Sequence, residues 1–247
     1  MRAAEDMASG EHRYVDFHTR PARPRAAVLL LHGGRADALA PPTRWNLPGL
    51  RMRPFARALA RATAEEQVAV AHARYRYRGW NGVRADAAAD AGAALAALVE
   101  EVGKVPVVLV GHSMGGRAAL RIGGAAGVRG VVALAPWCPP GEPVAQLAGQ
   151  RVALLHGDRD RMTDPRGTWS FAARARAAGA RTCAVVVSGS DHPMIRRAET
   201  WHRSTVRLVR GMLWEEEMPA PVAAALDGPP DGHGGRRPIP LAEALPG

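Results

Sequence analysis

Six short apolar runs recur along the chain, and they constrain its fold more than any other feature of the sequence. The run at 105–110 is almost entirely Val and Leu and shows no polar alternation, as expected for a strand covered on both faces. The predicted strands are residues 26–32, 68–75, 105–110, 130–136, 151–157 and 181–187. Helical segments separate most of them. This alternation predicts an α/β fold with a doubly wound, mostly parallel sheet and helices on both faces.

The helices are predicted from the spacing of apolar side chains. In the segment 84–102 these side chains recur at i, i+3, i+4 and i+7, which places them on one face of a helix. The longer predicted helices are residues 54–66, 84–102, 166–178 and 193–214, and residues 11–20 are expected to form an edge strand.

The length of 247 residues suits a single α/β domain, which we expect to span residues 12–214. Residues 1–11 are expected to form a flexible N-terminus. Residues 215–247 contain seven prolines and no aromatic residue, and this composition predicts a flexible tail.

The net charge of +10 raises the question of a nucleic-acid partner. The basic residues are spread along the whole chain, and no dense basic cluster alternates with aromatic side chains. We therefore expect a solvated basic surface and no nucleic-acid partner. A functional polyanion site is the alternative, and it predicts salt-sensitive binding.

Localisation is inferred from what the sequence does not contain. No apolar run approaches the roughly 18 residues of a membrane-spanning helix, and the first residues carry no apolar core of a secretory signal. Cys138 and Cys183 show no paired spacing, which is typical of reduced cysteines. We expect a cytoplasmic protein with no membrane partner. The oligomeric state is not predicted.

The segment Gly111-His112-Ser113-Met114-Gly115 fits the pattern G-x-S-x-G between a buried strand and a helix. A serine at the tip of such a sharp turn has strained backbone angles, and the flanking glycines let the chain pass without Cβ clashes. We interpret Ser113 as a nucleophile. A plain glycine turn is the alternative.

A serine hydroxyl needs a base, and the base needs a carboxylate to hold its tautomer. Of nine histidines, His192 lies in a loop after a late strand, so we assign it as the base. Asp160, in the loop after 151–157, is the preferred acid, and Asp158 is the alternative. The histidines at strand ends next to glycine are interpreted as structural or supporting groups: His32, His112 and His156.

The oxyanion of a tetrahedral intermediate needs N–H donors. The backbone N–H of Met114, directly after the nucleophile, is one candidate. Gly34, in the loop after the strand 26–32, is the expected source of the second, and a simple tight turn is the alternative for it.

With these motifs the sequence resembles the α/β-hydrolase family. The residues that carry the resemblance are "LLLHGG", "VGHSMGG", "HGDRDRMTDP" and "SGSDHPM", and together with the strand order they cover about residues 12–214. The resemblance implies Ser113 as nucleophile, Asp160 as acid, His192 as base and the backbone of Gly34 and Met114 as oxyanion hole. The members that are most similar in size are small, soluble esterases and lysophospholipase-like or dienelactone-hydrolase-like proteins, and the resemblance implies no cofactor or metal. Too few residues separate the strands at 130–136 and 151–157 for a separate cap domain.

Four side chains are candidates for the walls of the substrate pocket: Trp45, Trp80, Trp137 and Met162. Core or groove packing is the alternative for the tryptophans. The loop 35–53 and the C-terminal tail are both candidates for covering the site. Several arginines flank the same edge and leave an acidic substrate open as an alternative: Arg76, Arg78, Arg159 and Arg161.

These inferences predict a serine hydrolase that cleaves a small carboxylic ester or thioester through an acyl-enzyme. One alternative keeps the triad for other chemistry, namely C–C hydrolysis, acyl transfer or perhydrolysis. Another alternative is a non-catalytic binding protein on the same scaffold.

Overall fold

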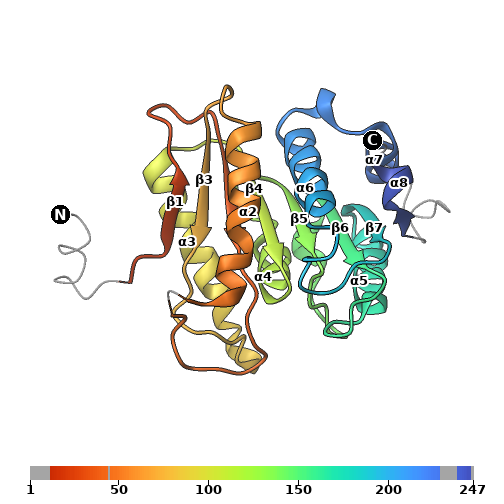
Figure 1. The fold of residues 1–247 in the computed structure, drawn as a ribbon, viewed down its shortest axis with the longest axis horizontal. Helices are drawn as coiled ribbons and strands as arrows, with labels where there is room; N and C mark the ends of the chain where they lie inside the picture. The colour runs from red at the N-terminus through yellow and green to blue at the C-terminus, as the bar shows by residue number, and fades with distance from the viewer. Residues whose placement is uncertain (1–11, 44, 229–237, 246–247) are drawn as a thin grey trace.

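The computed structural model describes residues 12–43, 45–228 and 238–245, and these residues form an eight-stranded sheet (Figure 1). The strands are β1 (Val15–Thr19), β2 (Ala26–Leu31), β3 (Val68–Ala73), β4 (Val107–His112), β5 (Val128–Leu134), β6 (Arg151–Gly157), β7 (Arg181–Val187) and β8 (Ile239–Pro240). Their order across the sheet is β1-β3-β2-β4-β5-β6-β7-β8. Only β1 pairs in the antiparallel sense among the described strands. The prediction of a mostly parallel α/β sheet is confirmed.

The apolar runs form the central strands because both of their faces are covered. Every residue of β2 and β4 is buried, and the two strands pair in parallel with Leu30 opposite Val110. Parallel pairing brings the carboxyl ends of β2, β4, β5, β6 and β7 to one edge of the sheet. The loops at this edge carry the candidate site residues.

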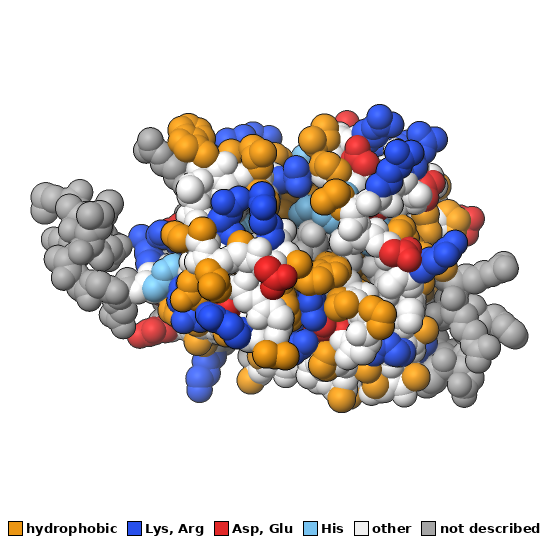
Figure 2. All heavy atoms as spheres, turned by 90° about the horizontal axis from the view of Figure 1, so that it is seen from below, with side chains coloured by type: hydrophobic (Ala, Val, Ile, Leu, Met, Phe, Trp, Pro, Cys, Tyr) orange, Lys and Arg blue, Asp and Glu red, His pale blue; other side chains and the backbone are white. Residues whose placement is uncertain are grey.

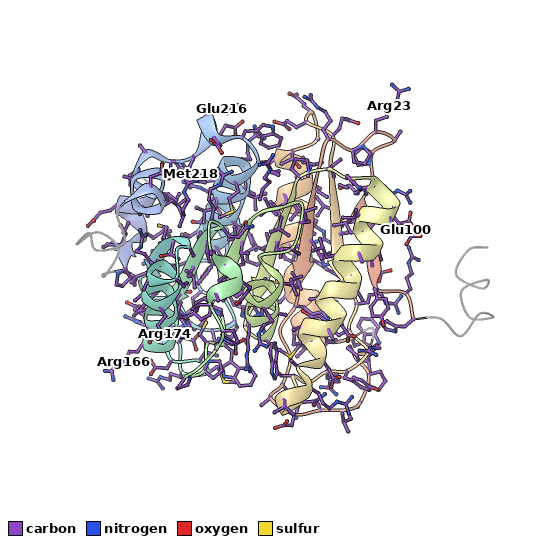
Figure 3. The ribbon with its side chains drawn as sticks, turned by 180° about the vertical axis from the view of Figure 1, so that it is seen from behind. Arg23, Glu100, Arg166, Arg174, Glu216 and Met218 are labelled. Atoms are coloured by element: carbon purple, nitrogen blue, oxygen red, sulfur yellow. The ribbon has the colours of Figure 1, made fainter. Side chains whose placement is uncertain are left out.

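Five long helices cover the two faces of the sheet. They are α2 (Leu47–Ala62), α3 (Asp86–Val102), α4 (Met114–Ile122), α5 (Pro165–Ala177) and α6 (Ala198–Leu213). Helices α3, α4 and α5 pack on the face seen in Figure 3, and α2 and α6 pack on the opposite face. Among the described helices, none has the length and apolar character that a membrane crossing requires.

The connection between β5 and β6 leaves the carboxyl edge without a cap domain, as predicted. Its only helical element is the short 3₁₀ helix η2 (Ala145–Leu147). Two further 3₁₀ helices, η1 (Gly82–Arg84) and η3 (Glu215–Glu217), lie elsewhere in the chain.

Helix α2 begins seven residues before the predicted start at residue 54. Pro48 occupies its first turn, where the missing N–H of proline costs nothing, and Pro54 lies inside the helix. The loop 35–53 is therefore shorter than expected, because its last seven residues are helical.

The described part of the C-terminal segment packs on the sheet, and the expectation of a flexible tail is wrong for it. Helix α7 (Ala220–Asp227) buries Val222 and Leu226, and β8 extends the sheet beside β7. The short helix α8 (Leu241–Ala244) follows β8. The proline content of the segment predicts flexibility, but Val222 and Leu226 are spaced i and i+4 and lie on one buried face of α7. Residues 1–11 and 229–237 lie outside the described residues.

Leu226→Ala is expected to lower the free energy of unfolding by about 2–4 kcal/mol, because it empties a buried site between α7 and the sheet. In a domain of this size that corresponds to a fall in Tm of roughly 5–15 °C. Val83→Ala is the control, since the Val83 side chain is fully exposed and its truncation is expected to leave Tm nearly unchanged. Calorimetry that gives both variants the wild-type Tm would show that α7 contributes nothing to stability.

Candidate active site

The carboxyl ends of β4, β6 and β7 bring Ser113, Asp160 and His192 into one hydrogen-bonded chain. His192 Nδ1 lies 2.7 Å from Asp160 Oδ2, and His192 Nε2 lies 3.0 Å from Ser113 Oγ. An ionised carboxylate only accepts hydrogen bonds, so His192 Nδ1–H is the donor to Asp160. Nε2 of the neutral ring then accepts the Ser113 hydroxyl proton. The three predicted residues are therefore arranged so that a proton can leave the serine.

Ser113 lies at a turn whose geometry demands glycine on both sides. Its backbone angles, φ 55° and ψ −119°, are rare for a residue with a side chain. A Cβ on Gly111 would lie 2.2 Å from the Gly115 carbonyl oxygen, and a Cβ on Gly115 would lie 2.2 Å from the Leu31 carbonyl oxygen. The glycines thus allow close contact between β4, α4 and the end of β2, and this contact holds Ser113 at the tip.

Gly115→Ala is expected to reduce the free energy of unfolding by about 1–3 kcal/mol, because its methyl group overlaps rigid backbone. The matched control is Gly92→Ala in α3, where a Cβ meets open space. That change is expected to raise the free energy of unfolding by about 0.5–1 kcal/mol through helix propensity. Urea denaturation of the two variants compares them directly. Equal effects at the two positions would contradict the close contact described for the turn.

Asp160 is held by several donors at once. Its Oδ2 accepts from His192 Nδ1–H, from His156 Nε2–H at 3.0 Å and from the Thr163 hydroxyl at 3.0 Å. Its Oδ1 accepts from the backbone N–H groups of Met162 and Thr163. Burial by itself would raise the pKa of Asp160, but the bonds from His156, His192 and Thr163 together hold the pKa far below its usual range. The carboxylate therefore stays ionised beside His192.

The two candidate aspartates differ in what they contact. Asp158 accepts a hydrogen bond from the backbone N–H of Gly189 at 2.7 Å, and it joins the loops after β6 and β7. Asp160 lies two residues further along the turn and contacts His192. The structure thus brings the preferred acid, rather than the alternative, to the histidine.

Two supporting residues lie behind the acid. His156 is fully buried, with Nδ1 2.8 Å from the Thr168 hydroxyl. Because its Nε2–H points at Asp160, Nδ1 accepts from Thr168. This agrees with the interpretation of His156 as a supporting group. Thr163, whose hydroxyl also lies 3.1 Å from His192 Nδ1, was not identified from the sequence. The only indication in the sequence was that Thr163 follows Asp160 by three residues, close enough for its hydroxyl to contact the carboxylate.

His112 supports the base from the other side. It is buried, and its Nε2 lies 3.0 Å from the backbone carbonyl oxygen of His192, which ties the end of β4 to the loop that carries the base. Burial lowers the pKa of His112 to about 3. The ring is therefore neutral at pH 7 and donates its Nε2–H to that carbonyl.

The protein is expected to lose stability as the pH falls below about 6.5. Burial lowers the pKa of His112 to about 3, and burial with the nearby His18 lowers that of His72 to about 4. Between these values and the unfolded pKa of about 6.5, the unfolded chain binds protons that the folded chain does not. Unfolding therefore becomes more favourable with acid.

Calorimetric Tm values from pH 8 to pH 4 test this expectation. His72→Gln removes a histidine whose pKa is lowered and which lies outside the candidate site. The Tm of this variant should therefore fall less steeply with acid than that of the wild type. A wild-type Tm that does not change between pH 7 and pH 4.5 would contradict it.

The two residues predicted for the oxyanion hole are in contact, because Gly34 packs against the Met114 side chain. A Cβ on Gly34 would lie 2.6 Å from Met114 Sδ and 2.4 Å from the Arg78 carbonyl oxygen. Gly34 and Met114 both line the cavity that contains Ser113. Within the described part of the chain, neither backbone N–H has a protein acceptor. Both groups are therefore available to a ligand, and their role as an oxyanion hole is part of the proposal below.

A cavity of about 890 Å³ opens beside Ser113 and His192. Three of the four predicted wall residues line it: Trp45, Trp137 and Met162. Trp45 and Met162 are largely exposed, at 69% and 77%, so these side chains form an open rim. Residues 35, 36, 43 and 45–48 also contribute to the lining, whereas none of the described residues after His192 does.

Trp80 is the exception among the predicted wall residues. It is 2% exposed and does not line the cavity. The Arg117 guanidinium group lies 3.8 Å from its ring centre and 4.5 Å from that of Trp137, and Arg117 also pairs with the buried Glu142. Trp80 therefore packs in a core cation–π cluster, and its assignment to the pocket wall is wrong.

Among the residues that the structure describes, no three His, Cys, Asp or Glu side chains form a group that could hold a metal ion. The expectation that no metal or cofactor takes part remains an expectation.

The comparisons with known proteins agree on the fold. The sequence model described as "Alpha/beta hydrolase family" matches residues 28–242. No curated protein matches the sequence.

Three solved structures illustrate the likeness. The monoacylglycerol lipase of Paleococcus ferrophilus has a TM-score of 0.59 at 16% identity, over 82% of this chain and all of that one. The butyrate-bound esterase Est2 of Thermogutta terrifontis has 0.59 at 18%, over 82% and 88%. XC6422 of Xanthomonas campestris, described as a serine hydrolase without a lid, has 0.54 at 18%, over 79% and 86%. At these identities the likeness establishes the fold alone.

Proposed function

Because the chain belongs to the alpha/beta hydrolase family, we propose that it is a serine hydrolase that cleaves a small carboxylic ester or thioester. The observation that carries this proposal is the hydrogen-bonded chain from Asp160 through His192 to Ser113. A buried, ionised carboxylate, a neutral imidazole and a hydroxyl in this order are what nucleophilic catalysis by serine requires.

In the first half of the proposed reaction, Ser113 Oγ attacks the ester carbonyl carbon while His192 Nε2 takes the hydroxyl proton. Asp160 keeps its charge and stabilises the imidazolium form of His192. The carbonyl oxygen becomes an oxyanion, which in this proposal the N–H groups of Gly34 and Met114 bind. Both residues line the cavity, and neither N–H has a protein acceptor among the described residues, which supports this role. The bond to the leaving group then breaks, and His192 returns its proton to the departing alcohol or thiol.

In the second half, water attacks the acyl group on Ser113. His192 takes a proton from that water. The bond between the acyl carbon and Ser113 Oγ then breaks, and His192 returns the proton to Oγ, which releases a free acid and restores the serine hydroxyl. Trp45 and Met162 at the rim of the cavity are largely exposed, which supports access of water to the acyl group.

Esterase-like structural neighbours support a small-molecule substrate. We also propose a cytoplasmic location. The two cysteines, Cys138 and Cys183, are buried and form no disulfide, which supports it. No nucleic-acid or membrane partner is part of the proposal.

Turnover of a matched substrate panel tests the proposed reaction class. We expect hydrolysis of p-nitrophenyl esters with acyl chains of two to eight carbons and of an acyl thioester. Cleavage of a β-diketone, acyl transfer to an added alcohol, or peroxyacid formation with hydrogen peroxide at higher kcat/KM than ester hydrolysis would favour the alternative chemistries. Purified, folded protein that turns over none of these substrates would favour a binding protein.

A further inference from the structure

The wall of the cavity beside Gly34 carries two arginines. Arg35 and Arg78 line it, and no Asp or Glu does. Within residues 12–43, 45–228 and 238–245, neither guanidinium group forms an ion pair or a hydrogen bond. Some other arginines of this chain pair with carboxylates, as Arg76 does with Asp90 and Arg117 with Glu142. The cavity therefore has uncompensated positive charge close to the proposed nucleophile.

Both arginines are fixed to the site by backbone hydrogen bonds. The N–H of Arg35 donates to the Arg78 carbonyl oxygen at 2.9 Å, and the N–H of Trp80 donates to the Arg35 carbonyl oxygen at 2.9 Å. The N–H of Arg78 donates to the carbonyl oxygen of Ala40 at 2.9 Å. The same Arg78 carbonyl packs against Gly34. The loops that supply the proposed oxyanion donor and the two arginines therefore form one bonded unit.

The surface around the cavity also carries basic side chains. Figure 2 looks onto the carboxyl edge of the sheet and shows basic and hydrophobic side chains over much of it, with acidic side chains scattered among them. The cavity is also lined by apolar side chains, with Leu47, Trp137 and Met162 among them. A ligand that fits both parts has a hydrocarbon portion and an anionic group.

We propose that the substrate is an ester or thioester that carries a carboxylate or a phosphate, and that Arg35 and Arg78 bind this group. The inference rests on the proposed function and adds its substrate class. A guanidinium group presents paired donors that match the two oxygens of a carboxylate or phosphate. The cavity is open to solvent, which screens part of the attraction, so we expect each arginine to contribute roughly a tenfold preference.

The test compares esters that differ in the anionic group. For the carboxylate, p-nitrophenyl hydrogen adipate is paired with p-nitrophenyl hexanoate, which has the same acyl length. For the phosphate, 4-acetoxyphenyl phosphate is paired with phenyl acetate. The measured quantity is kcat/KM for the anionic ester divided by kcat/KM for its neutral partner. The intrinsic reactivity of each ester is the same for every variant, so it cancels when this ratio is compared between variants.

We expect Arg35→Gln and Arg78→Gln each to lower this ratio roughly tenfold for at least one pair, and the pair affected identifies the anion. Arg166→Gln is the matched control. Arg166 lies at the start of α5 on the same edge and is labelled in Figure 3, but it does not line the cavity, so the ratio should not change. Added salt should lower the ratio in the wild type more than in the Arg35→Gln, Arg78→Gln double variant.

Ratios that are the same in the wild type and in the double variant would overturn the inference. If Ser113 still reacted and neutral esters still turned over, the proposed function would stand without it. Calorimetric titration with adipate and with inorganic phosphate tests the arginines without turnover. Weaker binding of one of them to the double variant than to Arg166→Gln supports the inference, and equal binding, or none to the wild type, overturns it.

Discussion

Ser113→Ala is expected to lower kcat for ester hydrolysis by roughly 10³–10⁶ while the protein stays folded. The substitution removes the oxygen that His192 Nε2 contacts at 3.0 Å, so no acyl-enzyme can form. The remaining groups at the site can only bind and polarise the substrate. Initial rates with p-nitrophenyl butyrate, normalised to the concentration of folded protein, give the comparison.

Ser170→Ala is the matched control for this loss. Ser170 is exposed on α5, and its removal is expected to leave kcat and Tm unchanged. The Tm of Ser113→Ala should also stay within a few degrees of the wild type, which separates loss of chemistry from loss of fold. Near wild-type turnover by purified Ser113→Ala would refute the proposed mechanism.

Asp160→Asn is expected to lower kcat by roughly 10⁴. The carboxylate oxygen Oδ2 accepts from His192 Nδ1–H, and an amide that turns its NH₂ group toward the ring favours the wrong imidazole tautomer. His192 would then present an N–H, rather than a lone pair, to Ser113. The same kinetic assay measures the effect.

Asp158→Asn makes the comparison specific. An asparagine oxygen can still accept from the N–H of Gly189, so this variant is expected to keep most of the activity. An active Asp160→Asn beside a folded but inactive Asp158→Asn would reverse the assignment of the acid. The pairing of Ser113 with His192 would remain.

The sheet and the position of the candidate site could be predicted from the sequence because both depend on short-range patterns. Continuous apolar runs such as 105–110 identify strands buried on both faces. In a parallel sheet the residues after each strand share one edge, so the positions of Ser113, Asp160 and His192 after β4, β6 and β7 predicted that they would meet. The distances among them agree with this reasoning.

The sequence was less informative where packing between distant segments decides the structure. Proline content predicted a flexible segment after residue 214, but α7 buries Leu226 and β8 pairs with β7. Trp80 follows a strand at the edge of the sheet that carries the site, but its side chain is buried in the core against Arg117. Contacts of this kind join residues far apart in the chain, and no local pattern records them. The sequence also could not predict that Arg35 and Arg78 line the same cavity, because they lie far apart in the chain.

The most direct test of the central claim is covalent labelling of Ser113. The protein is treated with a fluorophosphonate and digested with trypsin, which releases the peptide 105–117 that contains this serine. We predict that mass spectrometry will find the adduct on Ser113 in the wild type and in Ser170→Ala, and none in Ser113→Ala. Folded wild-type protein with no adduct, or with an adduct that Ser113→Ala retains, would contradict the proposal that this serine is the nucleophile.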